Sequence, residues 1–236
     1  MSTAADFLPD GPTPLGSEQW RRDYNLVRIF GGANSTLRSP EESEIGLFWT
    51  EHTGKQYARA FGYLADTYSL SVPDTARLMA ILWTGYADAV IGCFNAKYKY
   101  GFWRPVTAVT AGSAISDPEP AWLPLGTTPN HPEYPAAHGC ITGAVSSLIA
   151  GYFGTSRVHF TVDSMSFPDR VHTHVFEDMR DLFDEVFWSR MYAGFHYFHS
   201  LRDGGDLGAT VARELLRNHF RLQHGTPETS QGKSRE

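Results

Sequence analysis

Cysteine is scarce in this chain, and long apolar runs and basic clusters are missing. The two cysteines, Cys93 and Cys140, are too few for a disulfide framework or for a zinc site built only from thiolates. They leave the redox compartment undecided. The longest apolar stretches fall short of the roughly 20 residues that a bilayer-crossing helix needs, so we expect no membrane span.

The charge balance argues against a nucleic-acid partner. The 236 residues include 20 Lys and Arg against 26 Asp and Glu, a net charge of −6, and there is no basic run. The chain therefore lacks the basic surface that nucleic-acid phosphates bind, and we expect no nucleic-acid partner. The first ten residues lack the basic start and apolar stretch of a signal peptide. The expected protein is soluble, either cytoplasmic or exported after removal of a leader, and its localisation stays unknown.

The pattern of apolar residues predicts a mainly helical protein. Hydrophobic residues make up 42% and aromatic residues 14% of the chain, which indicates a well-packed core. Ser39-Pro40-Glu41-Glu42 has the form of a capping box with proline at the first helical position. Helical periodicity and end signals predict helices over residues 19–30, 40–49, 55–68, 75–97, 138–152, 169–190 and 203–219.

Two other stretches are not predicted to be helical. Residues 157–162 favour one short strand, and residues 101–135, which hold seven of the fourteen prolines, favour a long irregular connection. The expected fold class is all-α, a helical bundle with long irregular connections and an oxyanion site in the bundle core. The expected organisation is an extended arm (1–16), a single helical catalytic domain (17–224) and a flexible polar tail (225–236).

Three separated segments carry the polar groups that suggest chemistry. The first runs from Lys97 to Arg104-Pro105, the second from His131 through Pro-Glu-Tyr-Pro-Ala-Ala to His138-Gly139, and the third from Ser189-Arg190 to His196. A multiply charged oxyanion needs several cations that converge from different segments, with the planar fork of arginine and the compact charge of lysine as donors. The start of a helix at His138 would add backbone N–H groups and a favourable dipole.

These spacings resemble the superfamily of type 2 phosphatidic acid phosphatases and vanadium haloperoxidases. Its pattern is K-x-x-x-x-x-x-R-P, then P-S-G-H, then S-R-x-x-x-x-x-H-x-x-x-D. Lys97 and Arg104-Pro105 match the first part, and Ser189-Arg190 and His196 match most of the third. The sequence around these motifs, including Pro132-Glu-Tyr-Pro135, is more similar to the haloperoxidase branch than to bacterial acid phosphatases. The resemblance covers roughly residues 20–220.

The resemblance implies a role for each matching residue. His196 would bind vanadate or attack phosphorus, and His138 would act as general acid and base. Lys97 would polarise bound peroxide, and Ser189 and Ser200 would lie behind the site. The predicted oxyanion-binding residues are Lys97, Arg104, Arg190, Ala137 and Gly139.

The same resemblance implies the ligands. We expect vanadate as cofactor, with phosphate able to occupy the same site, and neither zinc nor a nucleotide. The predicted reaction is oxidation of halide by hydrogen peroxide at a vanadate bound to a histidine. One alternative is hydrolysis of a phosphate monoester through a phosphohistidine, and a second is a vanadate-free homologue that binds an anion or has been repurposed. The substrates would be small molecules: halide, peroxide or a phosphate ester. A homodimer is also compatible with the resemblance.

The chain departs from the pattern at three positions. Ala136 removes a hydroxyl donor worth roughly 1–3 kcal/mol, and Ala137 adds a Cβ where glycine would let the backbone approach the anion. Ser200 stands where an aspartate would orient His196; serine accepts the hydrogen bond without adding charge, and Asp203 or Asp206 could substitute. We therefore expect a weakened or retuned oxyanion site.

Several other polar residues have ordinary explanations. Lys99 lacks the family spacing, which Lys97 has. His172 and His174 would not converge on a metal if they lay on a helix, because side chains two apart diverge there. Glu133 and Tyr134 are expected at solvated loop positions. His199 is expected at a pocket rim or on the surface, and Cys140 as a small buried hydrophobe with a reactive thiol as the alternative.

Overall fold

The long helices begin at residues whose side chains can cap them. In the computed structural model, which describes residues 3–113 and 115–220, Ser17 caps α1 (Glu18–Phe30), and Ser71 caps α4 (Val72–Tyr100). Ser39 forms the predicted capping box at the start of α2 (Pro40–Phe48). The other helices are α3 (Thr53–Thr67), α5 (Pro105–Ala111), α6 (Ala137–Phe153), α7 (Met179–Tyr192), α8 (Phe198–Asn218) and the short 3-10 helix η1 (Ala4–Phe7).

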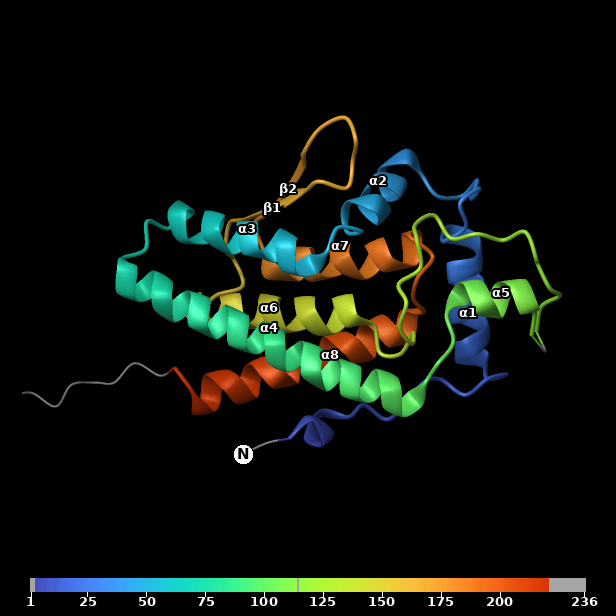
Figure 1. The fold of residues 1–236 in the computed structure, drawn as a ribbon, viewed down its shortest axis with the longest axis horizontal. Helices are drawn as coiled ribbons and strands as arrows, with labels where there is room; N and C mark the ends of the chain where they lie inside the picture. The colour runs from blue at the N-terminus through green and yellow to red at the C-terminus, as the bar shows by residue number, and fades with distance from the viewer. Residues whose placement is uncertain (1–2, 114, 221–236) are drawn as a thin grey trace, which may run out of the picture.

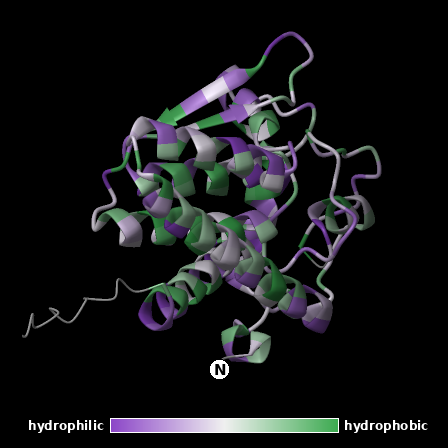
Figure 2. Ribbon diagram, turned by 60° about the vertical axis from the view of Figure 1, so that its left-hand side comes forward, coloured by the Kyte–Doolittle hydropathy of each residue, from purple (hydrophilic) through white to green (hydrophobic). Residues whose placement is uncertain are grey.

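Helix α6 lies at the centre of the bundle. It contacts α4, α7 and α8, and Figure 1 shows it enclosed by them. Its side chains Ile141, Val145 and Leu148 join the largest cluster of buried apolar residues. In Figure 2 the inner helices carry more hydrophobic colour than the loop at the top of the view. The predicted all-α bundle is therefore confirmed, with two short strands added to it.

Helix α4 also passes a length and composition test for crossing a membrane. The stretch Val72–Ala111, which includes α4, contains an 18-residue window that is apolar enough for a membrane span. No apolar stretch long enough for one was expected from the sequence. In the structure α4 packs against α6 and α8 and supplies buried residues such as Leu78 and Ile81. These buried side chains belong to the core of the bundle, and 39% of the most apolar 18-residue window is buried inside the structure.

The region between α6 and α7 differs from its prediction. The strands β1 (Phe160–Ser164) and β2 (His172–Phe176) form an antiparallel hairpin, with Val162 opposite His174. The predicted strand was placed too early, and the predicted helix from Asp169 was wrong because α7 begins at Met179, where Asp178 caps it. β-Branched residues and alternation favour extended backbone over this stretch.

Two further helix boundaries were mispredicted. The connection over 101–135 contains α5, which begins at Pro105, and proline at a first helical position is compatible with a helix. Helix α8 begins at Phe198, earlier than the predicted residue 203. The predicted tail, residues 225–236, lies outside the described residues, and the domain boundaries remain predictions.

The N-terminal arm packs on the bundle. Its helix η1 contacts α4 and α8, the Tyr100 hydroxyl donates to Pro9 O, and the Thr13 N–H donates to His199 Nε2 at 3.2 Å. His199 is buried there, and its Nδ1 lies 2.6 Å from Asp23 Oδ2, so the expectation of a rim or surface position was wrong.

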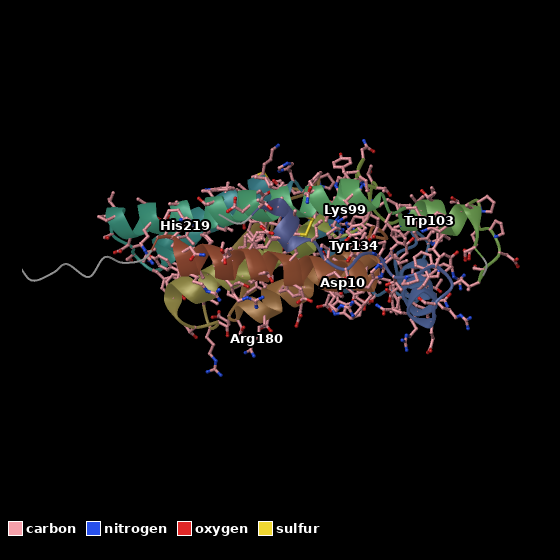
Figure 3. All side chains as sticks on the ribbon, turned by 90° about the horizontal axis from the view of Figure 1, so that it is seen from below. Asp10, Lys99, Trp103, Tyr134, Arg180 and His219 are labelled. Carbon is pink, nitrogen blue, oxygen red and sulfur yellow. A yellow bond between two sulfur atoms is a disulfide. The ribbon has the colours of Figure 1, made fainter. Side chains whose placement is uncertain are left out.

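A disulfide joins two of the central helices. Cys93 of α4 and Cys140 of α6 are fully buried and bonded to each other, and Figure 3 shows the yellow bond close to the labelled Tyr134. Cys140 was expected as a buried thiol, so its bonding was not predicted. The link lies two residues after His138 on α6 and ties that end of the helix to α4.

Candidate active site

The three predicted segments meet beside one large cavity. Its volume is about 1220 Å³, and its walls come from α2, α3, α4, α6, α7 and the connections around them. Polar groups from the second and third segments lie in its wall: His131, Ala137, His138, Arg190 and His196. Lys97 and Arg104 are buried behind this wall.

His196 is held in one tautomer. Its Nδ1 lies 2.8 Å from Glu133 Oε1, and its Nε2 lies 3.0 Å from Arg104 Nη1. Because a guanidinium only donates, Nε2 accepts and the ring proton is on Nδ1, which donates to Glu133. Burial, together with the charges of Arg104, Lys97 and Arg190, holds the pKa of His196 well below its usual value. The ring is therefore neutral near pH 7, with the lone pair on Nε2.

Glu133 is the carboxylate that orients His196. It is fully buried, and its Oε1 also accepts from the Tyr197 N–H at 3.0 Å. Burial raises the pKa of Glu133, and the charges of Lys97 and Arg104 oppose that rise. The expectation that Glu133 is solvated was wrong.

Ser200 does not make the contact expected of it. Its hydroxyl is buried without a hydrogen-bond partner among the described residues, and its carbonyl accepts from the Ala136 N–H at 3.0 Å. Asp203, proposed as a substitute, instead accepts from the Tyr134 hydroxyl at 2.8 Å. That contact buries Tyr134, which was expected in a solvated loop.

Arg104 connects the first segment to the other two. It is the N-cap residue of α5, and its guanidinium donates to Phe195 O at 3.0 Å, to His131 O at 3.1 Å and to His131 Nδ1 at 3.1 Å, besides His196. Burial lowers the pKa of Arg104 to about 10, which leaves it charged at neutral pH. Each of these bonds fixes backbone or an imidazole around the cavity.

Lys97 lies in the last turn of α4 and supports the second segment. Its Nζ donates to Pro132 O at 2.8 Å and to Glu133 O at 2.9 Å. Burial and the nearby charge of Arg104 lower its pKa well below the usual value. Its neighbour Lys99 is exposed, so the choice between the two lysines agrees with burial. Lys97 positions the loop that carries Glu133, and it does not line the cavity.

Arg190 and His138 share one acceptor. Trp49 O accepts from Arg190 Nη1 at 2.6 Å and from His138 Nε2 at 3.1 Å. The proton of His138 is therefore on Nε2, and Nδ1 keeps its lone pair. Burial and the charge of Arg190 hold the pKa of His138 well below its usual value, and burial lowers the pKa of Arg190 to about 9. The Arg190 Nε has no hydrogen-bond partner among the described residues, although it is buried.

His131 is a site residue to which the sequence assigned no role. Its Nδ1 lies 3.1 Å from Arg104 Nη2 and 3.2 Å from Pro132 O. Because a guanidinium only donates, Nδ1 accepts from Arg104 and the ring proton is on Nε2. The ring lies 5.1 Å from the Phe94 ring on the cavity wall. Burial and the charges of Lys97 and Arg104 lower its pKa to about 4. His131 stood at the head of the second motif, but nothing in the sequence links it to Arg104.

The small residues of the second motif separate into two groups. Ala137 lines the cavity, whereas Ala136 is fully buried as the N-cap residue of α6. Gly139, predicted to bind the oxyanion, faces α8: a Cβ there would lie 2.7 Å from Leu201 O. Glycine is required at this position because α6 and α8 pack closely there. Ser189 donates to Val186 O within its own helix at 2.7 Å.

Known proteins resemble this arrangement over most of the chain. The family model described as the VCPO second helical-bundle domain matches residues 77–225, which is more than half of the sequence. The chain belongs to this family. The resemblance inferred from the three motifs is thereby confirmed.

Relatives of this family carry vanadium-dependent peroxidase names. The chain is 29% identical over 181 residues to the vanadium chloroperoxidase of Curvularia inaequalis, which covers 62% of this chain and 30% of that protein. A bacterial vanadium-dependent iodoperoxidase structure matches with a TM-score of 0.79 and 24% identity, over 92% of this chain and 54% of that one. A holo-type bacterial vanadium-dependent chloroperoxidase matches with a TM-score of 0.70 and 16% identity, over 93% and 53%. This family member thus spans about half the length of those structures and less than a third of the curated relative.

Variants of Glu133 and Ser200 test which of the two residues orients His196. Glu133→Gln should destabilise the fold by about 3 kcal/mol, because the buried negative charge near Lys97 and Arg104 is lost. It should also shift the His196 Nδ1 resonance, because a neutral amide oxygen is a weaker acceptor for Nδ1–H than a carboxylate. Ser200→Ala should change neither property, since its hydroxyl makes no bond. ¹⁵N NMR of the imidazoles and chemical denaturation measure the two effects. The reverse outcome, with His196 disturbed only by Ser200→Ala, would refute the assignment.

The depressed pKa of His131 predicts sensitivity to acid. An unfolded histidine takes up a proton near pH 6.5, but folded His131 does so only near pH 4, so stability present above pH 6.5 is lost as the pH falls toward 4. His131→Phe should reduce this loss by about 1–2 kcal/mol, a figure discounted for its half-exposed ring. Denaturation curves at pH 7, 6 and 5 measure it, with His159→Phe as control. Parallel pH dependence in wild type and His131→Phe would contradict the prediction.

Proposed function

We propose that this chain provides the vanadate site of a haloperoxidase that oxidises halide with hydrogen peroxide. The observation that carries the proposal is the state of His196, which lines a cavity together with Arg190 and His138. Its Nδ1–H is held by Glu133, and its unprotonated Nε2 accepts from Arg104, a hydrogen bond that a bound vanadium would replace. An unprotonated imidazole nitrogen is a good metal ligand, and the proton on the other nitrogen fixes its direction. Membership of the VCPO family supports the same conclusion.

The residues present fit an oxyanion such as vanadate. Arg104 and Arg190 stay charged at neutral pH and outnumber the buried carboxylate of Glu133 even when Lys97 is left out of the count, so the site has an excess of positive charge. The Nε–H of Arg190 is a buried donor that has no hydrogen-bond partner in residues 3–113 and 115–220. His196 would hold the vanadium, with Arg190, Arg104 and the amide of Ala137 as oxyanion donors. Phosphate has the same charge and shape and would compete.

The chain's own residues supply the proton transfers. Oxidation of a halide by hydrogen peroxide consumes one proton and gives hypohalous acid and water, and bound vanadate would supply the Lewis acidity. His138 has its Nε2–H engaged by Trp49 O, so the unprotonated Nδ1 is the atom that would take a proton from incoming peroxide and return it to the leaving oxygen. His131 Nε2–H is a neutral donor at the same wall. Lys97 acts through the loop that it supports.

Thr128 is our candidate for the hydroxyl donor that Ala136 lacks. It lines the cavity, and its Oγ1 is buried without a partner among the described residues. Its loop packs on the ring beside His196, because a Cβ on Gly126 would lie 2.6 Å from Phe195 Cζ. A buried hydroxyl without a partner is costly unless a ligand satisfies it.

The Thr128 assignment has a matched control in its neighbour. Thr128→Val keeps the shape of the side chain and removes the hydroxyl, so phosphate and vanadate affinity should fall about tenfold, or about 1.4 kcal/mol. Thr127→Val, at an exposed position of the same wall, should leave affinity unchanged. Isothermal titration calorimetry with each anion measures the difference. Equal affinities in Thr128→Val and wild type would remove Thr128 from the site.

The reaction itself is tested by parallel assays. Vanadate-loaded wild-type protein should oxidise bromide or iodide with peroxide, and apo protein should not. His196→Ala should abolish this activity, because no other group replaces the imidazole nitrogen. Hydrolysis of an aryl phosphate by the apo protein, inhibited by vanadate, would instead establish the phosphatase alternative. Full turnover by His196→Ala in either assay would overturn the role of His196.

A further inference from the structure

One backbone oxygen controls two residues of the proposed site. Trp49, fully buried at the end of α2, offers its carbonyl oxygen to both Arg190 Nη1 and His138 Nε2. Arg190 is an oxyanion donor in the proposed site and His138 is its proton carrier. Whatever fixes Trp49 therefore fixes the separation of these two groups.

The Trp49 side chain is held by a second cluster of charged residues. Its indole Nε1 donates to Glu185 Oε1 of α7 at 2.9 Å, and His174 Nδ1 of β2 lies 2.7 Å from the same oxygen. The His174 ring stacks on Phe48, the residue before Trp49, with centroids 3.8 Å apart and an interplanar angle of 11°. Figure 1 shows the hairpin that carries His174 beside α2 and α7.

His174 lies between two carboxylates. Its other nitrogen, Nε2, is 3.2 Å from Glu44 Oε2 of α2, so each ring nitrogen faces an acceptor oxygen. Both nitrogens must donate for both contacts to be hydrogen bonds, which requires an imidazolium. His172, two residues earlier on the same strand face, bonds the other oxygen of Glu44 at 2.8 Å, and Val162 of β1 is uncharged.

The charges around His174 support this state. Burial alone would lower the pKa of His174, but the hydrogen bonds and charges of Glu185 and Glu44 outweigh burial and raise its pKa above the usual value. In the described part of the chain, no group of three or more His, Cys, Asp or Glu side chains is arranged to hold a metal ion. Because both contacts of His174 with carboxylates require a protonated ring, these contacts depend on pH.

We propose that His174, bonded between Glu44 and Glu185, is a positioning residue for the anion site. It holds Trp49 in place, and the carbonyl oxygen of Trp49 in turn accepts from both Arg190 and His138. The roles of Arg190 and His138 in this inference rest on the proposed function, whereas the contacts that join His174 to Trp49 do not depend on it. With the imidazolium present, α2, α7 and the hairpin are bonded together at Trp49. With neutral His174, one contact with a carboxylate is lost and Trp49 is held less firmly.

The chain offers a matched control on the same hairpin. His159, one residue before β1, pairs with Glu177 at 2.7 Å, but both side chains are much more exposed, at 43% and 74%. The corresponding exposures of His174 and Glu185 are 18% and 21%. No described hydrogen bond links the His159 pair to Trp49. His174→Gln and His159→Gln therefore remove similar pairs with different connections.

The experiment measures His138 directly. Exchange of the His138 Nε2 proton with solvent, followed by NMR at pH 6, should be at least tenfold faster in His174→Gln than in wild type, and unchanged in His159→Gln. Phosphate affinity, measured by calorimetry, should fall about tenfold in His174→Gln alone. The difference in exchange between His174→Gln and wild type should vanish as the pH rises through the pKa of His174, a dependence that a merely structural contact would not show.

The outcomes separate this inference from the proposed function. Wild-type exchange rates in His174→Gln, or equal acceleration in His159→Gln, would overturn the positioning role. Absence of phosphate and vanadate binding in the wild type would refute the proposed function, while the exchange measurement would still decide the role of His174. If His174→Gln does not fold, Glu44→Gln keeps the bond from His174 to Glu185 and should move the onset of fast exchange to lower pH; an unmoved onset would count against the proposal.

Discussion

The buried carboxylate of Glu133 is the interaction on which the site depends. Its Oε1 lies 2.8 Å from His196 Nδ1, while Lys97 bonds the Glu133 backbone carbonyl and Arg104 bonds the other nitrogen of the His196 ring. The charges of Lys97 and Arg104 act on the carboxylate and oppose the rise of its pKa, so that the buried negative charge and the nearby cations favour one another. Glu133 sits in a proline-rich loop, and the Lys97 ammonium bonds the backbone of that loop. Fold and chemistry are therefore coupled at one residue.

The sequence predicted most of the helical frame because helix ends have local causes. Ser39 with Glu42 made the capping box that was expected, and the apolar length of α4 excluded a strand. The gathering of Arg104, His138, Arg190 and His196 at one site was expected only because the three motifs resemble a known family; spacing within a motif is local and does not say where separate segments meet. Interactions between segments had no such signal. Glu133 meets His196 across 63 residues, and Arg104 meets His131 across 27.

The hairpin shows how an error in secondary structure becomes an error in function. Read as a helix, residues 169–178 place His172 and His174 on different faces, and the pair has no joint role. As strand β2, the two side chains share one face and both reach Glu44. The alternation was visible in the sequence, but the stretch was assigned to the helix that follows it. Cys93 and Cys140 posed a similar problem, since only the packing of α4 on α6 makes them neighbours.

The positions of His138 and His196 depend on how closely α6 and α8 approach each other. A Cβ on Gly143 would lie 2.5 Å from Gly205 O, and one on Gly204 would lie 2.7 Å from Ala136 O. Side chains at these positions would push the helices apart, and His138 at the start of α6 would move away from His196, which precedes α8. The glycines after the third motif thus set a distance that the charged residues use. Because interiors are close-packed, a gain of one methyl group here would be transmitted to the site rather than absorbed.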